Sequence, residues 1–195
     1  MGKVYAGLDD RLRHFIVQQP VFFVATAPSG TDAGDGGHVN VSPKGYRDTF
    51  AVLGPTTVAY LDLTGSGAET IAHLRQNGRI TIMFCSFDRT PKILRLYGSG
   101  RVVLPGDRDW GPLSGYFPAE AGSGPGGHRA IIVAELDRVS DSCGYAVPVM
   151  ELREERDLLT QWTERKTPGQ LQKYRAERNA ASIDGLPALA PAHPR

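Results

Sequence analysis

The stretch VAYLDLTGSGAETIAHLRQNGRITIMF (residues 58–84) decides the fold. It begins as a β-rich apolar run, passes through the turn Thr64-Gly65-Ser66-Gly67, and continues with helical spacing to Asn77-Gly78. A nearly continuous apolar run over residues 79–87 follows, which is typical of a central strand. This order predicts a strand, a glycine-flanked turn, a helix and a second, buried strand.

The turn at residues 64–67 has two interpretations. Ser66 followed by Glu69 fits a capping box, in which each side chain satisfies an orphaned backbone donor. A helix N-terminus also presents unpaired N–H groups and a partial positive charge, which favour phosphate. Glycines and hydroxyls suited to a close anion surround the turn: Thr64, Gly65, Ser66, Gly67 and Thr70. The stretch alone leaves both interpretations open.

A second segment, HVNVSPKG (residues 38–45), alternates between polar and apolar residues. His38, Asn40 and Ser42 share one face of the predicted strand. Pro43 removes a backbone donor, so Lys44 is expected at a strand end, where its charge can reach an anion. A solvated polar face is the alternative interpretation.

A third segment, KILRLYGSGRVVL (residues 92–104), predicts a strand whose leucines and Arg95 lie on opposite faces. The Arg95 face is expected to meet solvent or another subunit. Gly98 and Gly100 indicate a bulge or a close backbone approach.

The rest of the chain adds short strands and few helices, which predicts an antiparallel barrel with helices at its rim. Strands are expected near 21–27 and 128–143, and TFAVLG (49–54) and TVAYLDL (57–63) are expected to form a hairpin of two short strands around Gly54-Pro55. Helices are expected at 8–19, 107–116, 154–166 and 168–180. We assign residues 1–150 to the barrel, 151–185 to a helical extension packed on it, and 186–195 to a disordered tail.

Composition excludes several classes of function. The 195 residues carry a net charge of +1, so no global field favours nucleic acid or an anionic membrane. No apolar run is long enough to span a bilayer. Two cysteines, Cys85 and Cys143, form no disulfide framework and are typical of a cytoplasmic protein. Histidine and cysteine spacing suits no zinc site.

These segments together resemble the pyridoxamine 5'-phosphate oxidase-like family of FMN-binding split barrels, over about residues 8–140. The resemblance rests on HVNVSPKG, on residues 58–84 and on ILRLYGSGRVV. It implies a mainly β (α+β) fold, a six-stranded antiparallel split β-barrel with peripheral helices and a helical C-terminal extension. It also implies a homodimer that binds two FMN molecules in clefts between its subunits.

The resemblance further implies which residues contact the cofactor: Asn40, Val41, Ser42, Lys44, Tyr60, Leu61, Asp62, Leu63, Ser66, Gly67 and Thr70. Arg95 falls where the family's oxidases place a glutamine against the flavin ring, so it is a candidate for cofactor or partner contact. The oxidases' arginine–lysine pair before the helix is here Glu69-Thr70. The oxidases' C-terminal pyridoxal phosphate motif has no convincing match, so vitamin B6 oxidation is not expected.

The expected function is that of an FMN-dependent oxidoreductase acting on an unidentified small substrate. A barrel that binds or senses a flavin, a deazaflavin or haem without catalysis is the alternative, and a barrel that retains only the fold is a third. No residue is identified as a catalytic acid or base, and Tyr97, Cys143 and Tyr145 are candidates for facing the flavin.

Overall fold

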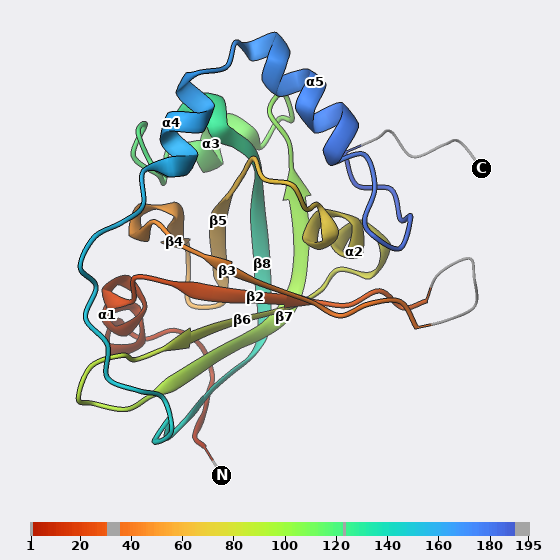
Figure 1. Ribbon diagram of the computed structural model, residues 1–195. Helices are drawn as coiled ribbons and strands as arrows, with labels where there is room; N and C mark the ends of the chain where they lie inside the picture. Colours follow the sequence, from red (N-terminus) through yellow and green to blue (C-terminus); the bar gives the residue numbers. More distant parts are fainter. Residues whose placement is uncertain (1, 31–35, 123, 190–195) are drawn as a thin grey trace.

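The computed structural model describes residues 2–30, 36–122 and 124–189 and is built on one antiparallel sheet (Figure 1). Its strands are β1 (Val4–Tyr5), β2 (Phe22–Thr26), β3 (Asn40–Lys44), β4 (Phe50–Val52), β5 (Thr57–Leu63), β6 (Arg79–Cys85), β7 (Ile93–Val103) and β8 (His128–Ser142). Its helices are α1 (Asp10–Gln18), α2 (Glu69–Asn77), α3 (Trp110–Ser114), α4 (Leu158–Glu164) and α5 (Pro168–Arg178), with 3-10 turns η1 (Arg47–Thr49) and η2 (Pro125–Gly127).

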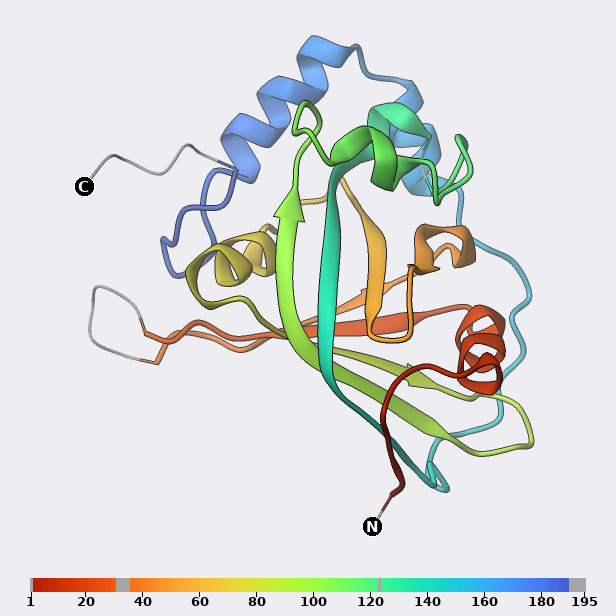
Figure 2. The same ribbon diagram turned by 180° about the vertical axis from the view of Figure 1, so that it is seen from behind.

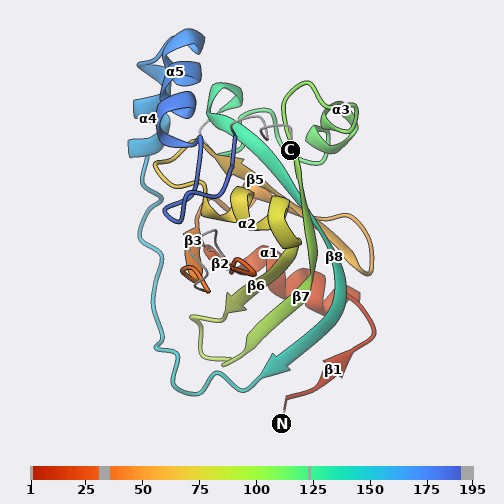
Figure 3. The ribbon, with the colours of Figure 1, turned by 90° about the vertical axis from the view of Figure 1, so that its right-hand side faces the viewer.

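The sheet curls because its two longest strands bend. The strand order is β3-β2-β6-β7-β8-β5-β4, and β1 pairs with β8 beside this path. Strands β7 and β8 curve through the molecule, so β2 and β6 cross β5 at a steep angle (Figures 1 and 2). Figure 3 shows the same curvature from the side. The pairing of β7 with β8 shifts at Tyr97/Gly98.

The close backbone approach predicted at Gly98 is confirmed. A Cβ atom at this position would lie 1.9 Å from the Glu135 carbonyl oxygen, which no side chain tolerates. Glycine therefore permits the register shift at which β7 crosses β8.

The main core fills the concave side of the sheet. Helices α1 and α2 cover it with Leu12, Ile16 and Ile71, while Val24 and Ile82 face them from the strands. A smaller core lies on the opposite side of β5 and β8 and contains Ala59, Leu61, Phe117, Ile131 and Val133. Alternate residues of β5 thus serve two cores, which places Tyr60 and Asp62 on one side and Leu61 on the other.

The mainly β split-barrel architecture predicted from the sequence is confirmed. The described chain contains two strands beyond the six of the expected barrel: β1, which was not expected, and β4, which is the short strand expected before the turn at Gly54-Pro55. A segment over residues 143–157 leads back along one edge to α4 and α5, which lie over the end of the sheet where β5 finishes (Figure 1).

The tail assigned to residues 186–195 differs from the expectation in its first part. Ala188 is buried, and its backbone N–H donates to the Ala180 carbonyl, because Leu186 and Leu189 pack against the main core. Residues 190–195 lie outside the described part of the chain. No helix within the described residues is long and apolar enough to cross a membrane.

Candidate functional site

A small cavity of about 160 Å³ lies where β5 ends and the turn to α2 begins. Its lining comes from three separate parts of the chain: β3, the segment from β5 to α2, and the start of β8. The residues that line it are Ser42, Lys44, Leu63, Gly65, Gly67, Ala68, Glu69, Thr70 and Arg129. We call this cavity with its lining the cradle.

Two cations of the cradle share one buried carboxylate. The Lys44 Nζ lies 3.2 Å from Asp62 Oδ1, and Arg129 approaches Asp62 Oδ2 with Nε at 2.8 Å and Nη2 at 2.6 Å. Burial alone would raise the pKa of Asp62, but the Arg129 guanidinium and the Lys44 ammonium hold it below its ordinary value. Asp62 is therefore ionised at neutral pH, and the three groups carry one net positive charge.

A hydrogen-bonded network beneath the cradle fixes strand β3 to α2. Both N–H groups of the Asn40 amide are used, one donating to Thr26 Oγ1 at 3.1 Å and one to Thr70 Oγ1 at 3.0 Å. The Ser42 hydroxyl donates to Asn40 Oδ1 at 2.9 Å. The Asn40 side chain consequently positions its neighbours Ser42 and Thr70, which both line the cavity.

Of the two interpretations left open for the turn, the capping box between Ser66 and Glu69 is wrong. Helix α2 begins at Glu69 with Ala68 as its N-cap, and no side chain accepts a hydrogen bond from its first turn. Ser66 lies too far before the helix to cap it, because Gly67 and Ala68, which separate it from Glu69, have non-helical backbone conformations. A Cβ atom at Gly67 would lie 2.5 Å from Glu69 Oε2, so the Glu69 carboxylate folds over the turn.

Helix α5 holds the turn from outside. Arg175 donates to Thr64 Oγ1 from Nε at 3.0 Å and from Nη2 at 2.8 Å. The Asn179 amide donates to the Gly65 carbonyl at 2.8 Å, and Arg129 donates to the Gly67 carbonyl at 2.8 Å. Because these contacts occupy turn carbonyls, they fix the orientation of the peptide groups that precede α2.

The structure brings most of the sequence-predicted residues to this one place. Five of them line the cradle: Ser42, Lys44, Leu63, Gly67 and Thr70. Two others, Asn40 and Asp62, hydrogen-bond to lining residues. The Tyr60 ring is fully buried beneath the site, where burial and the Asp62 carboxylate raise its pKa well above the ordinary value.

The remaining predicted residues lie elsewhere. Ser66 is an exposed turn residue, Val41 is exposed on the strand face opposite Ser42, and Leu61 belongs to the smaller core. Arg95 does not line the cradle, and its Nη1 donates to Ser142 Oγ at 3.0 Å. Tyr145 and Cys143 are exposed in the segment after β8.

Sequence reasoning missed Arg129, Arg175 and Asn179. The pairing of β5 with β8 matches Asp62 to Ala130 and Leu63 to His128, which leaves Arg129 as an extra residue in a bulge. A bulge redirects a side chain against the simple alternation of a strand, so the pattern HRAIIV did not place Arg129 beside Asp62. The position of Arg129 directly before the apolar run AIIVA could nevertheless have indicated a buried ion pair, because a charge buried beside such a run requires a partner.

Comparison with known proteins gives the same family. The chain matches the model described as "Pyridoxamine 5'-phosphate oxidase" over residues 8–143. It is 42% identical over 199 aligned positions to the pyridoxamine 5'-phosphate oxidase family protein ustO of Aspergillus flavus, covering 95% of this chain and 77% of that protein.

Solved structures resemble the fold at low sequence identity. A HupZ variant from Group A Streptococcus matches with a TM-score of 0.51 and 19% identity, covering 69% of this chain and 98% of that one. An FMN-binding protein from Syntrophomonas wolfei matches with a TM-score of 0.42 and 15% identity, covering 68% and 78%. With the matched family model covering most of the chain and a curated relative aligned across nearly all of it, this protein belongs to the pyridoxamine 5'-phosphate oxidase family and has its split-barrel fold.

Proposed function

We propose that the protein binds FMN with the phosphate group in the cradle and acts as an oxidoreductase on a small substrate. The observation that carries the proposal is the convergence of Lys44 and Arg129 on a cavity at an uncapped helix N-terminus. Such a terminus offers free N–H groups and a partial positive charge to an anion. Membership of the family supports FMN as the molecule that carries this anion.

The residues present fit a phosphate group. A cavity of about 160 Å³ accommodates a phosphate and its nearest linker atoms but not a three-ring flavin, since pockets for whole ligands are commonly ~300–1,000 Å³. The flavin ring therefore extends outside the cradle in this proposal. Asp62 neutralises only one of its two cationic neighbours, and the Glu69 carboxylate, which also lines the cradle, offsets the charge that remains. A phosphate would therefore be held by direct contacts with the two cations and with the N–H groups at the start of α2.

The chain's own residues bind and orient, while bound FMN supplies hydride or electron transfer. Lys44 provides a flexible charge, 22% exposed, at the rim of the cavity. Arg129 is fixed by Asp62 and by two turn carbonyls, so it sets the shape of the turn as well as its charge. The Thr70 hydroxyl accepts from Asn40, so its O–H can donate to the phosphate, whereas the Ser42 O–H already donates to Asn40 Oδ1.

A visible spectrum and an FMN titration followed by quenching of flavin fluorescence test this proposal. We expect saturable quenching, and at least tenfold weaker binding in Lys44→Met, because one charge-assisted contact with the phosphate is lost. Lys173→Met, an exposed change on α5, is the matched control and should bind as the wild type does.

The same preparation separates the rival functions. Bleaching of the bound flavin by NADPH or NADH supports an oxidoreductase, whereas tight binding without reduction supports a carrier or sensor. A Soret band in the isolated protein would indicate haem. A colourless protein with no saturable FMN quenching would refute the FMN proposal in both its catalytic and its binding form.

A further inference from the structure

A chain of polar side chains leads from the cradle into the main core and ends at His73. The His73 side chain is fully buried on α2, and its Nδ1 lies 3.0 Å from Thr26 Oγ1. Thr26 Oγ1 accepts from the Asn40 amide at 3.1 Å, and the same amide donates to Thr70 Oγ1 at 3.0 Å. Hydrogen bonds through Thr26 and Asn40 thus connect the buried imidazole to a hydroxyl that lines the cradle.

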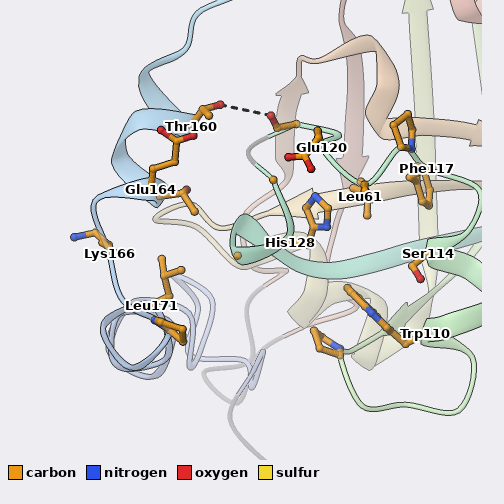
Figure 4. A pocket seen from close by; sticks show the side chains of 18 of the residues that line it. Leu61, Trp110, Ser114, Phe117, Glu120, His128, Thr160, Glu164, Lys166 and Leu171 are labelled. Atoms are coloured by element: carbon orange, nitrogen blue, oxygen red, sulfur yellow. Dashed lines mark hydrogen bonds between the residues drawn. The ribbon is translucent and has the colours of Figure 1, made fainter.

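This polar chain is separate from the largest cavity, of about 1100 Å³, which lies on the opposite side of β5 (Figure 4). One wall of that cavity contains Leu61, Trp110 and Phe117, and α4 and α5 form the other (Figure 4). Its charged lining residues balance one another: Glu120, Glu164, Lys166 and Arg175. The lining therefore favours no particular ligand charge, and the described residues of the polar chain lie outside it.

The His73 ring is neutral at neutral pH, so one of its two nitrogens is an acceptor. Burial lowers the pKa of His73 below the ordinary 6.5 and outweighs the opposite effect of Asp184 and Glu69. Nε2 is buried without a hydrogen-bond partner in the described part of the chain. The ring consequently exchanges its hydrogen bond through Nδ1, with Thr26.

The donors of the chain fix the direction of each hydrogen bond. Asn40 donates through its amide N–H groups, so Thr26 and Thr70 both accept. The Thr26 hydroxyl proton then has His73 Nδ1 as its acceptor among the described residues. The reverse direction would leave both the buried Thr26 proton and Nε2 without partners, whereas this direction leaves only the Nε2 proton. Nδ1 therefore accepts, and Nε2 carries the proton.

The His73 tautomer and the orientation of the Asn40 amide depend on each other. If position 73 offered no acceptor, the Thr26 proton would turn to Asn40, whose amide would rotate to place Oδ1 towards Thr26 and Thr70. Oδ1 would then accept from Thr70 as well, and the Thr70 hydroxyl would have no proton left for a ligand. In the observed orientation that proton is available to the cradle.

We propose that His73 is a positioning residue of the cradle: it accepts the Thr26 proton and so holds the Asn40 amide in the orientation that leaves the Thr70 hydroxyl free to donate to the phosphate. This inference rests on the proposed FMN-binding function and adds to it a residue that lies outside the cavity. His73 affects affinity only through Thr26 and Asn40, because it does not line the cradle.

A pair of variants at position 73 tests whether an acceptor is needed there, by FMN titration of the full chain followed through fluorescence quenching. Asparagine carries its amide oxygen as many bonds from the backbone as His73 Nδ1, so His73→Asn keeps an acceptor that His73→Leu removes. We expect His73→Leu to bind FMN about fivefold more weakly and His73→Asn to stay within about twofold of the wild type, because one hydrogen bond is at stake. Packing alone predicts the opposite order, since leucine fills the buried site better than asparagine does.

A second pair at Thr26 keeps the inference testable if the position-73 variants do not fold. Thr26→Val keeps the shape of the buried side chain and loses the hydroxyl, whereas Thr26→Ser keeps the hydroxyl and loses a methyl group. We expect Thr26→Val to weaken FMN binding about fivefold and Thr26→Ser to leave it near the wild-type value, because the hydroxyl carries the hydrogen bonds. Thermal unfolding of each variant measures its packing cost separately.

A double variant tests whether the effect of His73 passes through Thr70. Thr70→Val should weaken FMN binding by itself, and His73→Leu should cause no further loss in the Thr70→Val background, because residues of one network are not additive. Thr56→Val, an exposed change before β5, is the control and should bind as the wild type does. Additive losses, or equal losses in His73→Leu and His73→Asn, would overturn this inference alone. No FMN binding by the wild type would refute the proposed function together with it.

Discussion

At the scale of single residues, the balance of charge in the cradle depends on Glu69. Lys44 and Arg129 exceed Asp62 by one positive charge, and the Glu69 carboxylate, folded over Gly67, cancels it. A carboxylate at the first position of a helix favours the helix dipole but repels an incoming phosphate. Glu69 thus stabilises the start of α2 and at the same time repels the phosphate of the proposed ligand.

Removing this charge should strengthen FMN binding. In Glu69→Gln we expect the dissociation constant for FMN to fall about fivefold, since two like charges ~4 Å apart repel by about 1 kcal/mol even in bulk water. Fluorescence titration at low and high salt measures it, and the gain should shrink as salt screens the repulsion. Glu155→Gln is the control, and an unchanged or weaker affinity in Glu69→Gln would show that the carboxylate lies clear of the phosphate.

His73 should make stability depend on pH. Its ring is buried, Nδ1 lies 3.0 Å from Thr26 Oγ1, and burial lowers its pKa below the ordinary 6.5, outweighing the opposite pull of Asp184 and Glu69. The unfolded chain therefore binds a proton below pH 6.5 that the folded chain does not, so stability falls as pH decreases from about 6.5 towards the lowered pKa.

Denaturant unfolding at pH 7.5 and pH 5.5 measures this loss in the wild type. A His73→Gln variant should lose less stability between the two pH values, although it is less stable at both because the substitution disturbs a packed site. His14→Gln, a change on α1 outside the buried core, should keep the wild-type pH dependence. Equal pH dependence in all three proteins would assign the effect to other groups.

At the scale of elements, α5 works as a brace for the phosphate-side turn. Its contacts with the turn join residues 111 and 114 positions apart in the chain. Arg175 is half-buried, and burial together with the nearby Arg129 lowers its pKa. This environment disfavours the charged guanidinium, so its hydrogen bonds to Thr64 must hold it there. We infer that the C-terminal extension is needed to give the cradle its shape.

Loss of this brace should loosen the turn before it unfolds the barrel. We expect Arg175→Gln to lower the free energy of unfolding by about 1–2 kcal/mol, as hydrogen bonds from a charged donor are lost. Amide hydrogen exchange at residues 64–67 should quicken and FMN affinity should fall. Arg178→Gln, exposed on the same helix, is the control. Identical amide exchange at residues 64–67 in the two variants would contradict the proposal that Arg175 restrains the turn.

At the scale of the whole molecule, the sequence predicts the fold well because the fold follows local patterns. The apolar runs at 58–63 and 79–87 became β5 and β6, and the proline after Ser42 did place Lys44 at a strand end. The cradle was harder to predict, because Arg129 reaches Asp62 through a bulge and Arg175 through long-range packing. The Ser66 cap failed because two further non-helical residues precede α2.

The cradle encloses a phosphate but leaves a flavin ring uncovered, which argues for a second copy of the chain. Strand β3 is a sheet edge, and its Val41, 62% exposed, immediately precedes the cradle residue Ser42. Val39, on the same side of the chain, is 72% exposed. Exposed apolar side chains next to a ligand site are typical of an interface. We propose a homodimer that covers this edge and completes the flavin site.

Light scattering should then give a mass of twice the 21.1 kDa of one chain. We expect Val41→Glu to shift the protein towards monomer, because it places a charge in an apolar interface, and to weaken FMN binding in parallel. Val17→Glu, a change on α1 where valine is 59% exposed, should do neither. Dilution below the dimer dissociation constant should release FMN from the wild type, since each flavin needs both chains. Tight FMN binding by a monomer would show that one chain covers the ring alone.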